Sequence, residues 1–208
     1  MKHLLILIAC IAFATTAFSQ DDEKKTHFGI KTGMNLSAFS ASINSNSSMK
    51  PGFHFGFFLR SQSRPKLHLI TELYFSNQGQ KDEYVTGNGN TVLGRTTTTL
   101  NAINVPFLLE FGRVVTFQVG PQIGFLVSGR EKGTTSGNQK IDEDLKSIMK
   151  PLDIGIVIGL GIHPTKNLNL GARYNHGLTP VFNDPQGAPS DYPQIFNRVL
   201  HFYAGWSF

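Results

Sequence analysis

The sequence has little cysteine and little charge. Its only cysteine, Cys10, lies in an apolar segment near the N-terminus, so the remainder of the chain offers neither a disulfide nor thiolate chemistry. Charged residues make up 16% and aromatic residues 11% of the 208 residues. This composition is typical of neither a disordered chain nor a helix-rich one.

Long hydrophobic runs are also missing. The segment 4–14 is apolar, but a membrane-spanning helix needs roughly 20 apolar residues. Because this run follows Lys2 and is followed by small residues at Ala17 and Ser19, it predicts a secretory signal peptide over residues 1–19. A buried helix or a lipoprotein signal with Cys10 lipidated is a weaker alternative. The predicted mature domain is 20–208.

What the sequence does have is strict alternation of apolar and polar residues, which indicates β-strands with two different faces. The eight alternating segments are 27–37, 51–60, 67–77, 101–111, 115–128, 151–163, 167–176 and 198–208. The connections between them alternate between long and short. The short ones are "SQSRPK", "GRV" and "HPTKN", whereas "KDEYVTGNGNTVLGRTTTT" represents the long ones.

This rhythm predicts an all-β fold, an eight-stranded antiparallel up-and-down transmembrane β-barrel. Such barrels have short periplasmic turns and long outer loops, and an even number of strands places both termini in the periplasm. We expect "IDEDLKSIM", in the third long loop, to form a turn or two of amphipathic helix.

The two faces of the predicted strands differ in content. One face carries large apolar residues, such as Phe53, Phe55 and Phe57, and has neither charge nor glycine. The other face carries the strand glycines and six charged residues: Lys31, Arg60, Glu72, Glu110, Asp153 and Arg173. Glycine packs poorly on a solvent face but fits the narrow lumen of an eight-stranded barrel. The apolar face is therefore predicted to contact lipid.

The last segment, "HFYAGWSF", alternates in the same way and ends at Phe208. We expect Leu200, Phe202, Trp206 and Phe208 to face lipid, with Phe208 at the periplasmic rim, where aromatic girdles lie. An apolar alternation that ends in phenylalanine also resembles the signal read by the barrel assembly machinery, which is a predicted partner. An ordinary sheet edge is the alternative, and closure against the first strand would remove it.

Two prolines fall inside predicted strands. Proline removes a ladder hydrogen bond and is found mainly at edges and bulges, so we predict a bulge or irregular pairing at Pro106 and Pro121. The predicted register places Pro106 opposite Gly120. A regular hairpin there would mean that this register is wrong by one or two residues.

Several stretches resemble the PorT-like outer-membrane β-barrel domain family. They are "FGIKTGMNLSAFS", "KPGFHFGFFL", "LITELYFSNQGQK", "LNAINVPFLLEF", "VGPQIGFLVSG" and "LGARYNHGLTPV". The resemblance covers nearly all of the mature chain in order and implies an eight-stranded barrel in the outer membrane. One member of the family is tied to a secretion and gliding apparatus, and the resemblance implies no catalytic residues.

The inward charges suggest two roles. The favoured one is a plug of ion pairs and hydrogen bonds, and an ion or proton path is the alternative. The expected polar partners in the plug are Asn35, His54, Tyr74, Gln118, Gln122 and Asn169. Eight strands leave too little room for a porin-like channel.

The net charge of +5 does not indicate a nucleic-acid partner. The basic residues of the short turns, Arg64, Lys66, Arg113 and Lys166, have no acid among them, but no basic cluster interleaves with aromatic residues. We interpret these residues as aids to solubility and orientation, with contact to anionic lipid heads as the alternative.

A lipid A-modifying enzyme is a weaker hypothesis. Its candidates are His176 with Ser76, Ser128 or Thr179, and a nucleophile and base must come within about 3 Å. The mature histidines 27, 54, 68, 163, 176 and 201 are scattered and lack metal-site spacing. We therefore predict no catalytic, cofactor-binding or metal-binding residues.

The sequence thus predicts a non-enzymatic outer-membrane protein of the Gram-negative envelope with a structural or interaction role. Its long loops would face outward, and its surroundings would be membrane lipids and lipopolysaccharide. A subunit of a protein-secretion apparatus, or a narrow conduit, is the alternative.

Overall fold

The computed structural model describes residues 26–40, 46–85, 92–134, 139–183 and 194–208. The predicted signal peptide, including Cys10, lies outside the described residues. The described part of the chain contains no helix that is long and apolar enough to span a membrane.

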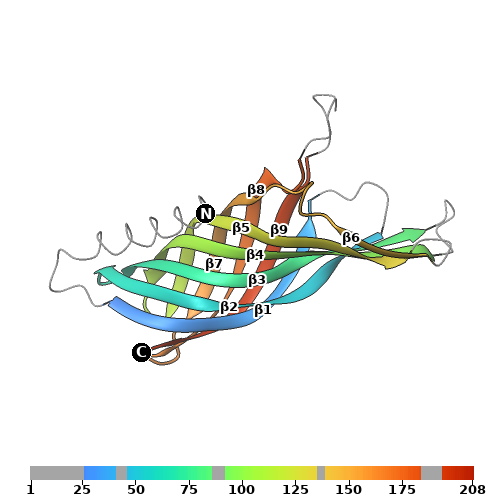
Figure 1. Cartoon of the computed structure of the whole chain (residues 1–208). Helices are drawn as coiled ribbons and strands as arrows, with labels where there is room; N and C mark the ends of the chain where they lie inside the picture. The colour runs from blue at the N-terminus through green and yellow to red at the C-terminus, as the bar shows by residue number, and fades with distance from the viewer. Residues whose placement is uncertain (1–25, 41–45, 86–91, 135–138, 184–193) are drawn as a thin grey trace.

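The described residues form nine strands joined in one antiparallel sheet (Figure 1). They are β1 (Thr26–Phe39), β2 (Asn46–Arg64), β3 (Leu67–Val85), β4 (Val92–Gly112), β5 (Val115–Thr134), β6 (Lys140–Asp144), β7 (Leu152–Ile162), β8 (Leu168–Pro180) and β9 (Phe196–Ser207). Eight of them close into a ring in the order β4-β3-β2-β1-β9-β8-β7-β5, and β4 pairs with β5 to complete it. The predicted eight-stranded barrel is confirmed, and β6 is an addition that pairs only with the far end of β5.

Short connections gather at one end of the barrel, which we call the turn end. They join β2 to β3, β4 to β5 and β7 to β8. The start of β1 and the C-terminal residue also lie there, and the Phe208 N–H donates to the Phe28 carbonyl over 2.8 Å. β1 and β9 pair from Gly29 opposite Ser207 to Phe39 opposite Asn197, so the terminal strand is not a sheet edge. We call the opposite end the loop end.

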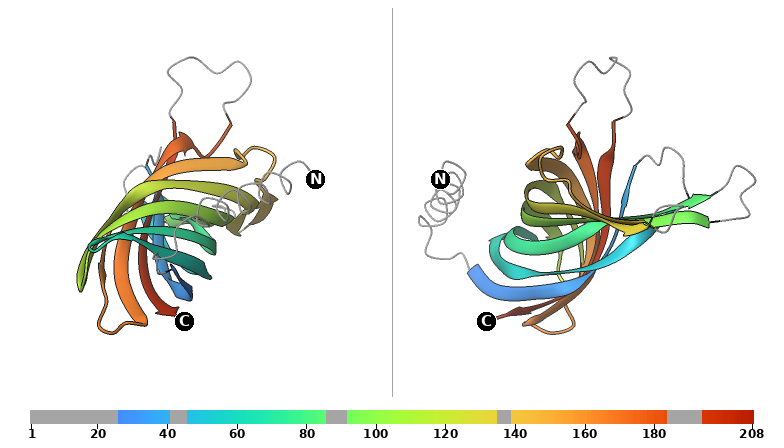
Figure 2. Two further views of the ribbon diagram at one scale, coloured as in Figure 1. Left: turned by 90° about the vertical axis from the view of Figure 1, so that its left-hand side faces the viewer. Right: turned by 45° about the vertical axis from the view of Figure 1, so that its right-hand side comes forward.

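The strands run further at the loop end than the alternation predicted. The stretch "KDEYVTGNGNTVLGRTTTT" is for the most part strand, because β3 continues to Val85 and β4 begins at Val92. With β5, this hairpin projects beyond the ring (Figure 2). The helix predicted in "IDEDLKSIM" is wrong in its first half, which belongs to β6; a single turn follows, in which the Met149 N–H donates to the Leu145 carbonyl.

The assignment of faces is confirmed along the whole ring. Met34 is 63% exposed while its neighbour Asn35 is fully buried, and the same alternation continues through the aromatic and aliphatic residues of every other strand. Phe55, Ile158 and Trp206 are all about half exposed on the outer surface. Because these side chains would be costly in water, the outer surface of the ring is built for lipid.

The predicted register near the two prolines is wrong by two residues. Pro106 lies opposite Gln122 rather than Gly120, and the β4–β5 ladder resumes in the same register at Leu109 opposite Val119. No bulge forms at the prolines, but the predicted irregular pairing is present, because Phe107 and Leu108 have no paired residue on β5. Each proline lacks an N–H, so it costs one ladder bond without shifting the strand. The register shift between these strands lies elsewhere, at Asn101 and Ala102.

Glycines make room for large polar side chains in the lumen. A Cβ atom at Gly171 would lie 2.5 Å from the Tyr203 hydroxyl oxygen, and one at Gly161 would lie 3.2 Å from it. Gly171 lies directly opposite Tyr203 on the neighbouring strand β8, and Gly161 lies beside it on β7. The side chain of Tyr203 therefore lies over these two strands because they have no side chains at these points.

Candidate functional site in the barrel lumen

The centre of the lumen is an ion-paired triad around Glu72. This buried carboxylate accepts from the Lys31 ammonium on one oxygen and from Arg173 Nη1, at 2.8 Å, on the other. Both cations also lie over the ring of Tyr203, 4.6 Å from the centroid for Lys31 Nζ and 4.5 Å for Arg173 Cζ. Buried charges need such pairing to offset their lost hydration.

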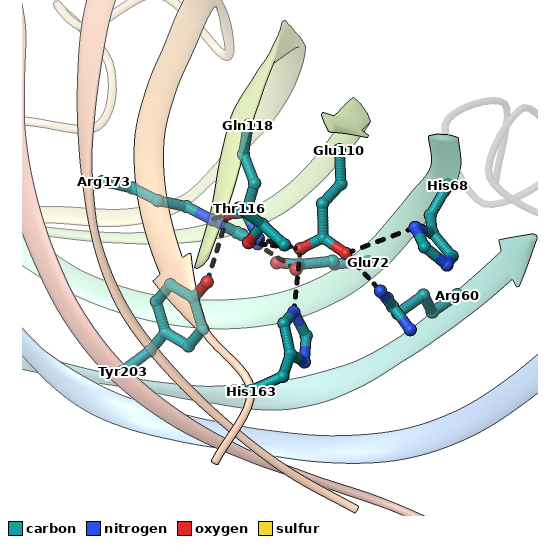
Figure 3. Close-up of polar contacts among 9 residues, drawn as sticks. All are labelled: Arg60, His68, Glu72, Glu110, Thr116, Gln118, His163, Arg173 and Tyr203. Atoms are coloured by element: carbon teal, nitrogen blue, oxygen red, sulfur yellow. Dashed lines mark hydrogen bonds and ion pairs between the residues drawn. The ribbon is translucent and has the colours of Figure 1, made fainter. Parts of the chain in front are cut away.

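A second carboxylate, Glu110, organises the turn end of the lumen (Figure 3). Arg60 Nε donates to its Oε1 over 2.7 Å, and His163 Nε2 lies 3.3 Å from its Oε2. His68 Nδ1 is more distant, at 3.9 Å from Oε1. The residues come from β2, β3 and β4 and from the turn before β8, so the contacts tie together three of the strands at this end.

Gln118 joins the two carboxylate clusters into one network. Its Nε2 donates to Glu110 Oε2 over 2.6 Å, and its Oε1 accepts from Arg173 Nε over 2.6 Å and from the Tyr203 hydroxyl over 3.1 Å (Figure 3). Thr116 also donates to Glu110, over 3.1 Å. The lumen is thus crossed by a continuous set of charged and polar contacts from the turn end to its centre.

On the loop-end side of the triad, two histidines share one hydrogen-bond acceptor. The Nδ1 atoms of His54 and His201 lie 2.6 Å and 2.8 Å from Asn35 Oδ1. The Asn35 amide nitrogen donates to Ser76 over 2.8 Å, which fixes its oxygen toward the histidines. Since a carbonyl oxygen only accepts, each imidazole carries a hydrogen on Nδ1.

An apolar cluster fills the loop end of the interior. Its buried members are Leu100, Leu145 and Met149, and it packs against Phe39, Leu126, Val181 and Phe182. We call these seven residues the mouth cluster. The segment after β6 supplies Leu145 and Met149, and backbone hydrogen bonds from Lys150 to Val181 and from Asn183 to Ile148 pin it to the chain that follows β8.

Five of the six polar partners predicted for the lumen take part in its hydrogen bonds. Asn35, His54 and Gln118 do so as described above, and Tyr74 donates to Gln122 over 2.7 Å. Asn169 is buried beside Gly205. Three further buried amides, Asn104, Asn175 and Asn197, were not predicted. Each lies at an inward-facing position of the strand alternation, which was the signal that could have identified them.

The candidates for an enzymatic site are not brought together. Ser76 is buried in the lumen at Asn35, whereas His176 lies on the outer surface beside Tyr174, whose hydroxyl is 3.3 Å from its Nδ1. Ser128 accepts from Asn101 over 2.9 Å, and Thr179 donates to Asp153 over 3.1 Å. Within the described ranges, none of these hydroxyls contacts His176. The same residues contain no cluster of three or more His, Cys, Asp or Glu side chains arranged for a metal ion.

The outer membrane protein beta-barrel domain family matches residues 18–183. The chain belongs to this family. The match identifies an outer-membrane β-barrel protein. The lipid-facing surface and the ion-paired lumen agree with this identification. It does not identify the narrower PorT-like group, which stays a prediction.

The chain is similar to solved structures of small outer-membrane proteins. Neisserial surface protein A has 14% sequence identity, with 87% of this chain and 97% of that chain covered and a TM-score of 0.51. The attachment invasion locus protein Ail of Yersinia pestis has 14% identity, with 88% and 99% covered and a TM-score of 0.48. A comparison with curated proteins found no match. At this identity, the likeness to Neisserial surface protein A shows the barrel fold alone.

Proposed function

We propose that this outer-membrane barrel acts as an interaction protein through the strands that project from its loop end, without conduction or catalysis. In this proposal the loop end faces the cell exterior and both termini lie in the periplasm. Lipids and lipopolysaccharide surround the ring, and the barrel assembly machinery reads the strand that ends at Phe208.

The filled interior supports a role outside the lumen. Glu72, Glu110 and their partners occupy the lower and central lumen, and the mouth cluster covers its loop end. A conduit would need a continuous path of water or titratable groups past both. The side chains that remain available for a partner are therefore those on the outside.

The observation that carries the proposal is an exposed apolar tip on the β3–β4 hairpin. Tyr84, Val92 and Leu93 are 42%, 45% and 39% exposed there. They lie beyond the apolar belt, separated from it by charged residues such as Arg95 and Glu83, which pair with each other over 2.7 Å. Exposed apolar groups in a polar surrounding mark protein contact sites, so the expected partner is a protein.

Two experiments test the proposal. The first uses the absence of cysteine from the mature chain. Leu93→Cys should react with a membrane-impermeant maleimide on intact cells, whereas Lys66→Cys at the turn end should react only after the outer membrane is permeabilised. The reverse pattern would invert the orientation and remove the hairpin from the cell surface.

The second experiment places a photoreactive amino acid at Leu93 or, as a control on the charged surface, at Lys132. A defined protein adduct should form from Leu93 alone. It should disappear when Tyr84 and Val92 are changed to serine. Gel migration that differs between unheated and boiled samples would show that this variant is still a folded barrel. Equal adducts from both positions, or none from Leu93, would contradict a contact site at the tip.

A further inference from the structure

The outer face of the projecting strands carries a row of positive charge close to the lipid belt. Lys81 on β3 lies opposite Thr97 on β4, and Thr97 lies opposite Lys132 on β5. Residues that lie opposite each other in a sheet have neighbouring side chains. Both lysines are exposed, as is Arg130, which lies two residues nearer to the belt on β5. The face therefore presents two lysines on either side of a hydroxyl, with an arginine beside them.

The acids on β6 do not fully balance the two cations of β5. Asp142 is shared, because its Oδ1 lies 2.7 Å from Arg130 Nε and its Oδ2 lies 3.7 Å from Lys132 Nζ. Asp144 lies opposite Arg130, but its Oδ1 accepts from the Lys146 N–H over 2.8 Å. One carboxylate thus serves two cations, and the second is engaged by the backbone.

On β2 and β3, two lysines lack an acid altogether. Glu83, the next outward residue after Lys81, is paired with Arg95 over 2.7 Å, and Lys81 has no ion pair within the described residues. Lys50 is only 8% exposed, and its Nζ donates to the neutral Oδ1 of Asn77 over 2.5 Å. The charge that acts on Lys50 is that of Lys81, another cation. Because like charges repel and a buried charge is costly unless it is compensated, an anion at this face would stabilise both lysines.

The height of these cations above the lipid belt indicates which anion they meet. On β3, β4 and β5 the belt ends at a boundary row of hydrogen-bonded side chains: Asn77, Asn101 and Ser128. With a rise of about 3.4 Å per residue and a strand tilt of about 40°, Arg130 lies about 5 Å above this row, and Lys81 and Lys132 lie about 10 Å above it. The polar headgroup layer is about 5–8 Å thick on each side of a bilayer, and long basic side chains can bend back into it.

We propose that the outer face formed by Lys81, Arg130 and Lys132 binds the lipid A phosphates of lipopolysaccharide. Lysine and arginine are common protein partners of phosphate, and the Thr97 hydroxyl between the two lysines can donate to a phosphate oxygen. A protein would have to reach this face through the headgroups, whereas lipid phosphates already lie at this depth. The inference rests on the proposed function for its orientation, with the loop end outside, but it needs no protein at the hairpin tip.

The test uses the full mature barrel, refolded in detergent, with lipid A as the probe. Lipid A with its phosphates intact is titrated at constant ionic strength, and lipid A from which the phosphates have been removed is the matched control. Native mass spectrometry counts the lipid bound to each barrel. The phosphorylated lipid should bind about tenfold more tightly than the control, and equal binding of the two lipids would overturn the proposal. Because the mixture contains no second protein, that outcome would leave a protein contact at the hairpin tip unaffected.

Three variants locate the contact on the barrel. Lys81→Gln combined with Lys132→Gln should weaken binding of the phosphorylated lipid about tenfold. Lys66→Gln combined with Lys166→Gln removes the same charge from exposed positions at the turn end and should leave binding unchanged. Asp142→Asn removes the acid that two of the cations share and should tighten binding severalfold. Equal losses from the two double variants would show a general attraction of anionic lipid to a basic protein, and either this result or unchanged binding by Asp142→Asn would contradict the proposed site.

Discussion

The ring inside the lipid belt and the hairpins beyond it are built on opposite patterns. In the ring, apolar residues face outward and ion pairs fill the interior. Beyond it, exposed ion pairs such as Arg95 with Glu83 and Arg130 with Asp142 cover the outer face, while the apolar mouth cluster lies inside. The same three strands, β3, β4 and β5, pass through both regions without a break.

A row of outward-facing polar side chains marks the boundary between the ring and the hairpins. Asn77 donates to Asn101 over 2.6 Å, and Asn101 donates to Ser128 over 2.9 Å, across β3, β4 and β5. The medium outside explains the inversion. In hydrocarbon the outward residue must be apolar and polar groups must be satisfied internally, whereas in water the usual arrangement of buried apolar residues returns.

The sharpest way to break this comparison is to remove a charge from the ring interior. Glu72→Ala leaves Lys31 and Arg173 buried without their shared counter-ion, and we expect a loss of about 3–5 kcal/mol in the free energy of unfolding. Denaturant unfolding of the barrel in lipid vesicles measures it. The fluorescence of Trp206, the one tryptophan of the chain, reports the transition.

The matched control is Glu83→Ala on the outer face of the hairpin. It breaks an ion pair whose side chains are 69% and 39% exposed, and exposed pairs contribute about 0–1 kcal/mol. Equal losses for the two variants would mean that the ring interior is as hydrated as the surface.

The inversion also explains what the sequence could predict. The predicted strand ends at 77, 101 and 128 are the ends of the apolar belt, not of the strands. Alternation of apolar residues reports a boundary with lipid, so it stopped at Asn77, Asn101 and Ser128 although hydrogen bonding continues to Val85, Val92 and Thr134. Stretches such as "GRTTTT" have strand propensity but no apolar face, and they look like loops.

The residues that face the lumen could be predicted from the alternation along the strands, but the mouth cluster could not. Strict alternation placed Lys31, Glu72 and Arg173 on the same inner face, although no spacing in the sequence says that they form one triad. Leu145 and Met149 belong to a segment with helical character in the sequence. They enter the barrel interior through long-range packing against residues such as Leu100, which local pattern does not encode.

A smaller effect is expected when a charge is added to the outer surface. Ile158→Arg places a cation in the middle of the lipid belt on β7, where the cost is about 2–4 kcal/mol near the bilayer midplane. Thr97→Arg makes the same change on the outer face of the hairpin and should cost at most a few tenths of a kcal/mol, because the group stays in water. Folding yield and denaturant midpoints in vesicles compare them. A large cost at Thr97 would place that residue in lipid and move the boundary outward.

Apart from the two surface controls, the smallest loss of stability is expected in the mouth cluster. Met149→Ala removes apolar contacts with Leu100 and Leu145. We expect it to lower the free energy of unfolding by about 2 kcal/mol, the low end for such truncations. The loss is small because the segment that carries Met149 lies at the end of the barrel and can move to fill the cavity. The loss should be local: amide exchange should accelerate in β6 and at Leu145, while β1 and β9 keep their protection. Conductance in planar bilayers should stay at background, because the Glu72 and Glu110 network still crosses the lumen below the cluster. If Met149→Ala opens a measurable current, the apolar cluster rather than the ion pairs closes the barrel, and the polar interior of the ring is wider than its contacts indicate.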